Sequence, residues 1–123
     1  MGSISLKHFT LDEFDSPDLP TSGQEMDITF LTMLDNARDI ADISFRITSG
    51  YRTESHNQQV GGVPDSAHTK GRAADIAATS GTQRWIIINS LLQAGFNRIG
   101  IANTFIHVDN DPDKPQSVIW TYN

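Results

Sequence analysis

Residues 66–76 read SAHTKGRAADI, and residues 105–109 read FIHVD. The first segment carries His68 and Asp75, and the second carries His107. Two imidazoles and one carboxylate can hold a divalent metal and leave one coordination position open for water, as in a catalytic zinc site. These two segments therefore predict a small zinc-dependent hydrolase whose metal ligands are His68, Asp75 and His107.

Strand periodicity predicts that His107 faces a cleft. Successive side chains of a strand alternate between its two faces. A strand over residues 104–109 would therefore send Ile106 and Val108 to one face, and His107 and Asp109 to the other. Because isoleucine and valine suit an apolar core, we expect the opposite face to line a cleft.

The residues around Asp75 predict how the ligands could meet. In a strand over residues 73–78, alanines would leave room around this carboxylate, which is costly in an apolar strand unless it is paired or bound to a metal. Gly71 permits a sharp return of the chain that would fold His68 over the strand. Two such strands side by side would bring Asp75 and His107 together.

Residue chemistry alone leaves other assignments open. A single histidine is more often a hydrogen-bonded core or surface residue than a ligand, and we expect His8 and His56 to be of that kind. Asp75 could instead cap a helix or pair with Arg72. The three candidate ligands favour metal binding only when they are taken together.

Composition excludes several classes of protein. The 123 residues, 37% of them hydrophobic and 20% charged, predict one globular domain over residues 1–123. A net charge of −6 without a basic stripe predicts no nucleic-acid partner. The chain has no cysteine, so a zinc ion would need histidine and carboxylate ligands.

The N-terminal sequence does not have the pattern of a signal peptide, because no apolar run follows a basic start. No apolar segment is long enough to cross a bilayer. We therefore expect synthesis in the cytoplasm, no membrane insertion, and a monomer.

Hydrophobic periodicity and turn residues predict an α+β fold. We expect a helical turn at residues 11–14, helices over residues 24–41, 53–60 and 80–94, and strands over residues 43–49, 73–78, 98–102, 104–109 and 118–122. Residues 61–71 are expected to form a loop. The expected buried face of the third helix comprises Trp85, Ile88, Leu91 and Leu92. The short late strands predict a small central antiparallel sheet flanked by helices.

Several motifs resemble the zinc D-alanyl-D-alanine carboxypeptidase family. They are SGYR at residues 49–52, VGG at 60–62, SxHxxGxAxDI at 66–76, GFxRIG at 95–100 and FIHVD at 105–109. The resemblance runs from about Phe9 to the C-terminus. It implies the fold that this family of D,D-peptidases shares with the signalling domain of hedgehog proteins.

The resemblance also implies roles for individual residues. It assigns one zinc ion per chain to His68, Asp75 and His107, and it assigns the binding and polarisation of the substrate carbonyl to Arg52. Ser66 matches a position that contacts the substrate or supports the site, although a simple loop-turn hydroxyl is an equal alternative.

The chain departs from the family pattern at the general base. Many relatives carry an acidic residue three positions before the last histidine ligand, where this chain has Thr104. Asp109, on the same predicted strand face as His107, is the candidate general base, and Glu54 and Asp65 are weaker candidates. The alternative role for Asp109 is to accept a hydrogen bond from the outer nitrogen of a ligand imidazole.

The implied function is hydrolysis of peptidoglycan stem peptides that contain D-amino acids, by a D-Ala-D-Ala carboxypeptidase or an endopeptidase of the endolysin type. The small size favours a phage-encoded enzyme that acts on the cell wall after release. One alternative is a metal-binding wall-binding module without catalysis, since Thr104 replaces the usual acid. A further alternative is a non-haem iron oxygenase, since His107, Asp109 and a second histidine could form a triad of two histidines and one carboxylate. This alternative is weaker because the helix expected over residues 80–94 lies where that fold needs strands.

Overall fold

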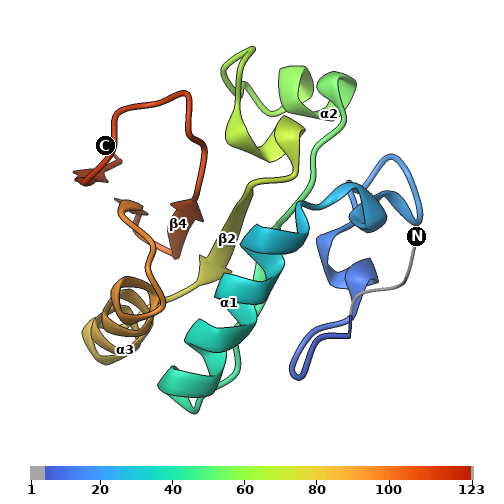
Figure 1. Cartoon of the computed structure of the whole chain (residues 1–123). Helices are drawn as coiled ribbons and strands as arrows, with labels where there is room; N and C mark the ends of the chain where they lie inside the picture. The colour runs from blue at the N-terminus through green and yellow to red at the C-terminus, as the bar shows by residue number, and fades with distance from the viewer. Residues whose placement is uncertain (1–4, 123) are drawn as a thin grey trace.

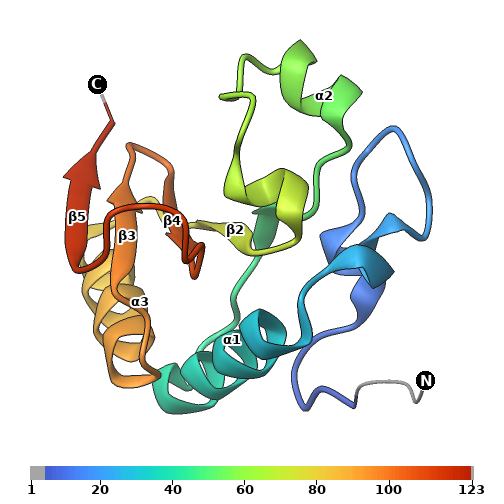
Figure 2. The same cartoon turned by 45° about the horizontal axis from the view of Figure 1, so that its top comes forward.

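In residues 5–122, which the computed structural model describes, five strands form one mixed sheet with two long helices on one face (Figure 1, Figure 2). The strand order is β1-β2-β4-β3-β5. The strands are β1 (Ile47–Ser49), β2 (Ala73–Ala77), β3 (Arg98–Ile101), β4 (Phe105–Asp109) and β5 (Val118–Thr121). We expect no signal peptide at the N-terminus, but its first residues, 1–4, lie outside the described residues.

The helices are α1 (Ile28–Ala41), α2 (Glu54–Gln59) and α3 (Gly81–Gln93), with 3-10 turns η1 (Leu11–Phe14), η2 (Ser22–Glu25) and η3 (Ala67–Lys70). The predicted turn at residues 11–14 is confirmed. The first helix begins later than expected because the Asp27 carboxylate accepts the N–H of Phe30 at 2.9 Å and caps the helix there. Within residues 5–122, no helix has the length and hydrophobicity needed to cross a membrane.

β1 is shorter than the strand expected over residues 43–49. Its Ile47 pairs with Ile76 of β2, and the N–H of Ala77 bonds to the carbonyl of Arg46. Because β2 ends at Ala77, the residues before Arg46 run past the end of their partner strand. The polar and apolar alternation of that segment therefore continues beyond its hydrogen-bonded part.

The α+β fold is confirmed, but the last strand does not pair as expected. β1–β2, β2–β4 and β3–β4 are antiparallel, whereas β5 runs parallel to β3. β4 ends beside the start of β3, so the loop over residues 110–117 crosses that end of β3 and enters β5 next to Arg98. A strand placed there must run antiparallel to β4 and hence parallel to β3.

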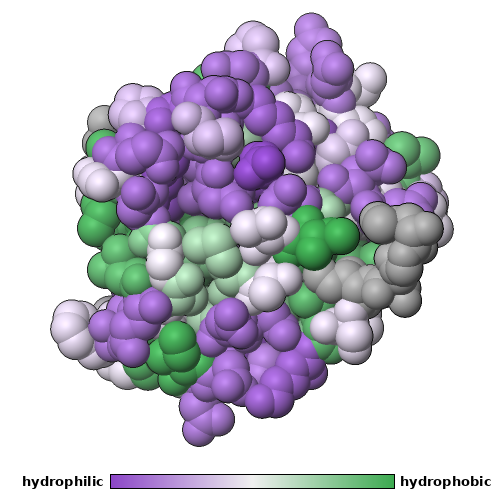
Figure 3. Space-filling model, viewed as in Figure 1, coloured by the Kyte–Doolittle hydropathy of each residue, from purple (hydrophilic) through white to green (hydrophobic). Residues whose placement is uncertain are grey.

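The apolar core lies between the sheet and the helices. Ile106 and Val108 of β4 are fully buried, together with Leu34 of α1 and Leu91 of α3. Burial of each such side chain contributes roughly 1.5–3 kcal/mol. On the molecular face of Figure 1, apolar side chains form a band across the middle, and hydrophilic side chains cover the part over α2 and its neighbouring loops (Figure 3).

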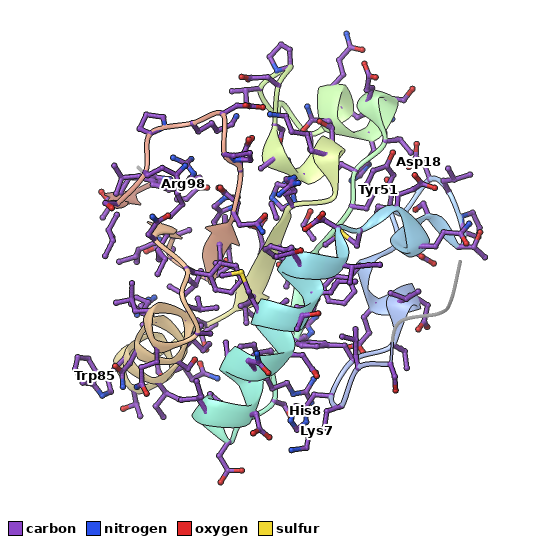
Figure 4. All side chains as sticks on the ribbon, viewed as in Figure 1. Lys7, His8, Asp18, Tyr51, Trp85 and Arg98 are labelled. Atoms are coloured by element: carbon purple, nitrogen blue, oxygen red, sulfur yellow. The ribbon has the colours of Figure 1, made fainter. Side chains whose placement is uncertain are left out.

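The face that α3 buries differs from the expected one. Ile87, Ser90 and Leu91 are buried, whereas Trp85 is 71% exposed and Leu92 is 46% exposed. Trp85 projects away from the sheet (Figure 4). The Ser90 hydroxyl donates to the Ile87 carbonyl at 2.8 Å, so a serine can occupy the buried face without an unsatisfied polar group.

Candidate metal centre

Three side chains from separate elements meet on the sheet face that lies opposite the helices. Asp75 of β2 pairs directly with His107 of β4, and His68 arrives from η3. One ligand atom from each of the three residues lies within 4.8 Å of the others, and all three side chains are buried. The structure thus brings together the three ligands that the sequence predicts.

Each imidazole has one nitrogen held by the protein and one directed at Asp75. The Nδ1 atom of His68 lies 2.8 Å from the carbonyl oxygen of Gly50. Because a carbonyl only accepts, Nδ1 carries a hydrogen, and Nε2 is directed at Asp75, 3.4 Å from Oδ1. In His107 the roles are reversed, with Nε2 2.7 Å from Oδ2 of Asp109 and Nδ1 2.9 Å from Oδ1 of Asp75. This donor set fits a divalent metal, which needs deprotonated ligand nitrogens with their outer N–H groups bonded.

The backbone of η3 fixes the position of His68. The Ser66 hydroxyl accepts the N–H of His68 at 3.2 Å, and the His68 carbonyl accepts the N–H of Arg52 at 3.1 Å. Gly71 closes the turn with φ +71°, and a Cβ there would lie 2.4 Å from the Glu25 carbonyl oxygen. The predicted return at Gly71 is therefore confirmed, although the 3-10 turn itself lies within a segment expected to be a loop.

The buried carboxylates of Asp75 and Asp109 favour a positive charge at the centre of the cluster. Burial alone would raise the pKa of the Asp75 carboxyl, but hydrogen bonds from His107 and His68 outweigh it and hold this pKa well below its usual range. Burial alone would lower the pKa of His107, but Asp109 and Asp75 outweigh it and raise this pKa. A cation bound at Nδ1 would supply the same positive charge with His107 neutral.

Asp109 lines the pocket, but both of its oxygens are engaged. Oδ2 faces His107, while Oδ1 accepts from Nε of Arg98 at 2.7 Å and from the N–H of Asp111 at 3.1 Å. Burial alone would raise the pKa of Asp109, but His107 and Arg98 outweigh it and lower this pKa. These contacts favour the role of imidazole acceptor over that of general base.

The guanidinium of Arg52 lies beside the candidate metal ligands. It donates to Ser49 at 3.1 Å and to Asn57 at 3.2 Å, and one amino group lies 3.5 Å from Oδ2 of Asp75. A Cβ at Gly62 would lie 2.0 Å from Oδ1 of Asn57. Gly62 of the VGG motif therefore leaves room for Asn57, which helps to hold Arg52 at the pocket.

The weaker candidates for the general base do not reach the site. Glu54 is exposed and does not line the pocket over the candidate metal ligands, and neither does Thr104, which stands at the position of the family's usual acid. Asp65 lies at the rim, where its side chain is 77% exposed. Within the part of the chain that the structure describes, Asp75 and Asp109 are the carboxylates that line this pocket.

Sequence reasoning missed an aromatic wall formed by β5. The Trp120 ring lies 5.5 Å from the His107 ring and also stacks against the guanidinium of Arg98. Gly100 faces Trp120 across the parallel strand pair, and a Cβ there would lie 2.7 Å from the rings of Trp120 and Tyr122. The glycine in the GFxRIG motif signals a close approach, but nothing in the sequence identifies what approaches it.

Comparison with known proteins gives one family. The model of the family described as Peptidase M15 matches residues 7–109. This span contains the three candidate metal ligands, Arg52 and Ser66, but it ends before β5. A search of curated proteins found no match.

Proposed function

The chain belongs to the peptidase M15 family, and on that basis we propose that it is a zinc peptidase that hydrolyses peptidoglycan stem peptides containing D-amino acids. M15 peptidases are metallopeptidases, and membership in this family supports a peptide substrate. The observation that carries the proposal is the arrangement of His68, Asp75 and His107, whose ligand atoms lie within 4.8 Å of one another.

One zinc ion per chain would be held by Nε2 of His68, a carboxylate oxygen of Asp75 and Nδ1 of His107. The hydrogen bonds of the two outer imidazole nitrogens support this choice of atoms. When bound, zinc supplies a Lewis acid that lowers the pKa of a water molecule and polarises the scissile carbonyl.

Arg52 binds the carbonyl oxygen of the substrate and stabilises the negative charge that develops on it. Its position supports this role, because one amino group lies beside Asp75 while Ser49 and Asn57 hold the rest of the guanidinium. Ser66 supports the site by accepting the N–H of His68. Its hydroxyl hydrogen remains available to the substrate at the pocket wall.

Asp109 orients His107 and keeps the hydrogen of this imidazole on Nε2. Arg98 in turn holds Asp109 with a hydrogen bond of 2.7 Å. Removing an acceptor behind a ligand imidazole typically costs about 10- to 100-fold in metal affinity or activity. Asp109 therefore acts on the reaction through His107.

The bond cut is the terminal D-Ala-D-Ala bond or a cross-link, so the enzyme is a carboxypeptidase or an endopeptidase of the endolysin type. We also propose that residues 1–123 form one domain, and that the protein is monomeric, is phage-encoded, is made in the cytoplasm and reaches the cell wall after release. These finer assignments rest on the motifs quoted above.

A wall-binding module without catalysis is the second candidate. It is favoured by the exposed position of Thr104 and by the engaged oxygens of Asp109. The two functions differ in what happens to purified peptidoglycan. Mass spectrometry after digestion with zinc-loaded protein should show shortened or uncrosslinked stem peptides, and a chelator should prevent this. Binding with unchanged stem peptides would instead favour the module.

A further inference from the structure

Lys114 is a cation at the pocket that the proposed mechanism does not use. Its side chain is only 18% exposed, and its ammonium donates to the carbonyl of Asp65 at 2.7 Å. Within residues 5–122, this carbonyl is its one hydrogen-bond acceptor. Since an ammonium has three donors, two remain for another group.

No nearby carboxylate fully neutralises this ammonium. The Asp65 carboxylate lies 3.6 Å away and is largely exposed, and the Asp111 carboxylate lies 3.8 Å away. Asp111 already has a closer partner in Lys70, at 2.8 Å. The pair with the exposed Asp65 contributes little, and the buried Asp111 is shared with Lys70, so the positive charge of Lys114 remains available to a ligand in the pocket.

The loop over residues 110–117 holds Lys114 in place. The Pro115 carbonyl accepts a hydrogen bond from Arg98, and Gln116 donates to the Asp111 carbonyl at 3.0 Å. Lys114 itself reaches across to Asp65, beside Ser66 on the opposite rim. The ammonium is therefore positioned before any ligand binds, which lowers the entropic cost of binding.

The other charged side chains in the pocket are already paired or belong to the candidate metal site, whereas Lys114 is not fully neutralised. Asp109 is matched by Arg98, and Asp75 belongs to the candidate metal site with Arg52 beside it. Lys114 lines the same pocket, and in the described residues it makes no hydrogen bond or ion pair with the three candidate ligands, so it can contact a part of the substrate other than the reacting carbonyl. The Lys114 ammonium can therefore bind an anionic group of the substrate, although the protein as a whole carries a net charge of −6.

We propose that Lys114 binds the free C-terminal carboxylate of the peptide and so makes the protein a carboxypeptidase. This inference rests on the proposed peptidase function. It selects the carboxypeptidase from the two modes of cleavage, because an endopeptidase substrate has no terminal carboxylate beside the bond that is cut.

The test compares N-acetylated L-Lys-D-Ala-D-Ala as its free acid and as its C-terminal amide, with zinc-loaded protein. Wild type should prefer the acid. In Lys114→Gln, the ratio of kcat/KM for acid to that for amide should fall about 10- to 100-fold, mainly through KM for the acid, as expected for losing a hydrogen bond to a charged group. Lys114→Arg should restore part of the preference.

Lys7→Gln is the matched control, because Lys7 pairs with Asp39 at 3.0 Å and does not line the pocket. It should keep the acid preference, and zinc content should be equal in all variants. The assignment is overturned if wild type does not distinguish acid from amide, or if Lys114→Gln slows both peptides equally. The assignment is also overturned if zinc-loaded wild type cuts cross-linked peptidoglycan but neither tripeptide, whereas failure to cut any of the three substrates would contradict the peptidase function itself.

Discussion

Asp75 and His107 lie directly opposite each other in the antiparallel pair of β2 and β4, with Nδ1 of His107 2.9 Å from Oδ1 of Asp75. Two of the three candidate ligands are therefore fixed by a hydrogen-bonded sheet, which positions side chains more accurately than a loop does. Only His68 comes from irregular backbone, and Ser66 and Gly71 restrain it there.

The replacement Asp109→Asn distinguishes the two roles considered for this residue. An amide offers one acceptor where the carboxylate bonds to both His107 and Arg98, so zinc affinity should fall about 10- to 100-fold. Excess zinc should then restore most of the activity. Isothermal titration with zinc, followed by assays at saturating zinc, measures both effects. Undiminished zinc affinity with a loss in rate of about 10²-fold or more would show that Asp109 is the general base.

The replacement Arg52→Lys keeps the charge but removes the planar guanidinium that binds Ser49, Asn57 and the proposed carbonyl. We expect kcat/KM to fall about 10- to 100-fold, with zinc content unchanged and only a small change in melting temperature. Arg72→Lys is a suitable control, since Arg72 pairs with Asp27 outside the pocket. A large drop in the melting temperature of Arg52→Lys alone would assign Arg52 to the fold.

The replacement Gly71→Ala should disturb the fold and the metal site together. Its φ of +71° is unfavourable for alanine, and the new Cβ would lie 2.4 Å from the Glu25 carbonyl oxygen. The free energy of unfolding should fall on the order of 1–3 kcal/mol, and zinc should bind more weakly because η3 carries His68. In Gly81→Ala the Cβ would meet nothing within 4 Å. Equal stability of the two variants in chemical denaturation would contradict this explanation.

The buried carboxylate of Asp111 predicts a pH-dependent contribution to stability. Burial alone would raise its pKa, but Lys70 and the N–H of Asp113 outweigh it and lower the pKa. A lowered pKa in the folded state stabilises the protein above the unfolded value of about 3.9, and this contribution is lost as the pH falls through the folded pKa.

Asp111→Asn should therefore lower the free energy of unfolding at pH 7, by about 1–3 kcal/mol. The difference from wild type should shrink below about pH 4. Urea denaturation of the chelator-treated protein measures this without a contribution from metal binding. A difference that stays constant between pH 7 and pH 3 would show that the Asp111 charge is not involved.

The parts of the site that follow from local periodicity could be predicted from the sequence. Alternation along residues 104–109 sends Ile106 and Val108 into the core and His107 toward the pocket, as the burial confirms. The meeting of Asp75 and His107 required only that their two short strands pair. Gly71 indicated the turn because few other residues adopt its backbone conformation.

The parts that depend on tertiary packing could not be predicted. The predicted stripe through Trp85, Ile88, Leu91 and Leu92 is right at Leu91, but a stripe through Ile87 and Leu91 is equally compatible with a helix. The choice between them depends on where α1 and β4 lie. Trp120 and Lys114 reach the pocket only because β5 runs parallel to β3, and that topology leaves no local pattern in the sequence.

The most direct test of the metallopeptidase mechanism is the rate of stem-peptide cleavage by chelator-treated protein as zinc is added. The rate should rise in proportion to zinc up to one equivalent per chain and then stay constant, while His68→Ala should bind no stoichiometric zinc and show no such rise. Cleavage that is equally fast before and after removal of the metal, or one tightly bound zinc per chain in His68→Ala, would contradict the assignment of His68, Asp75 and His107 as the site of the reaction.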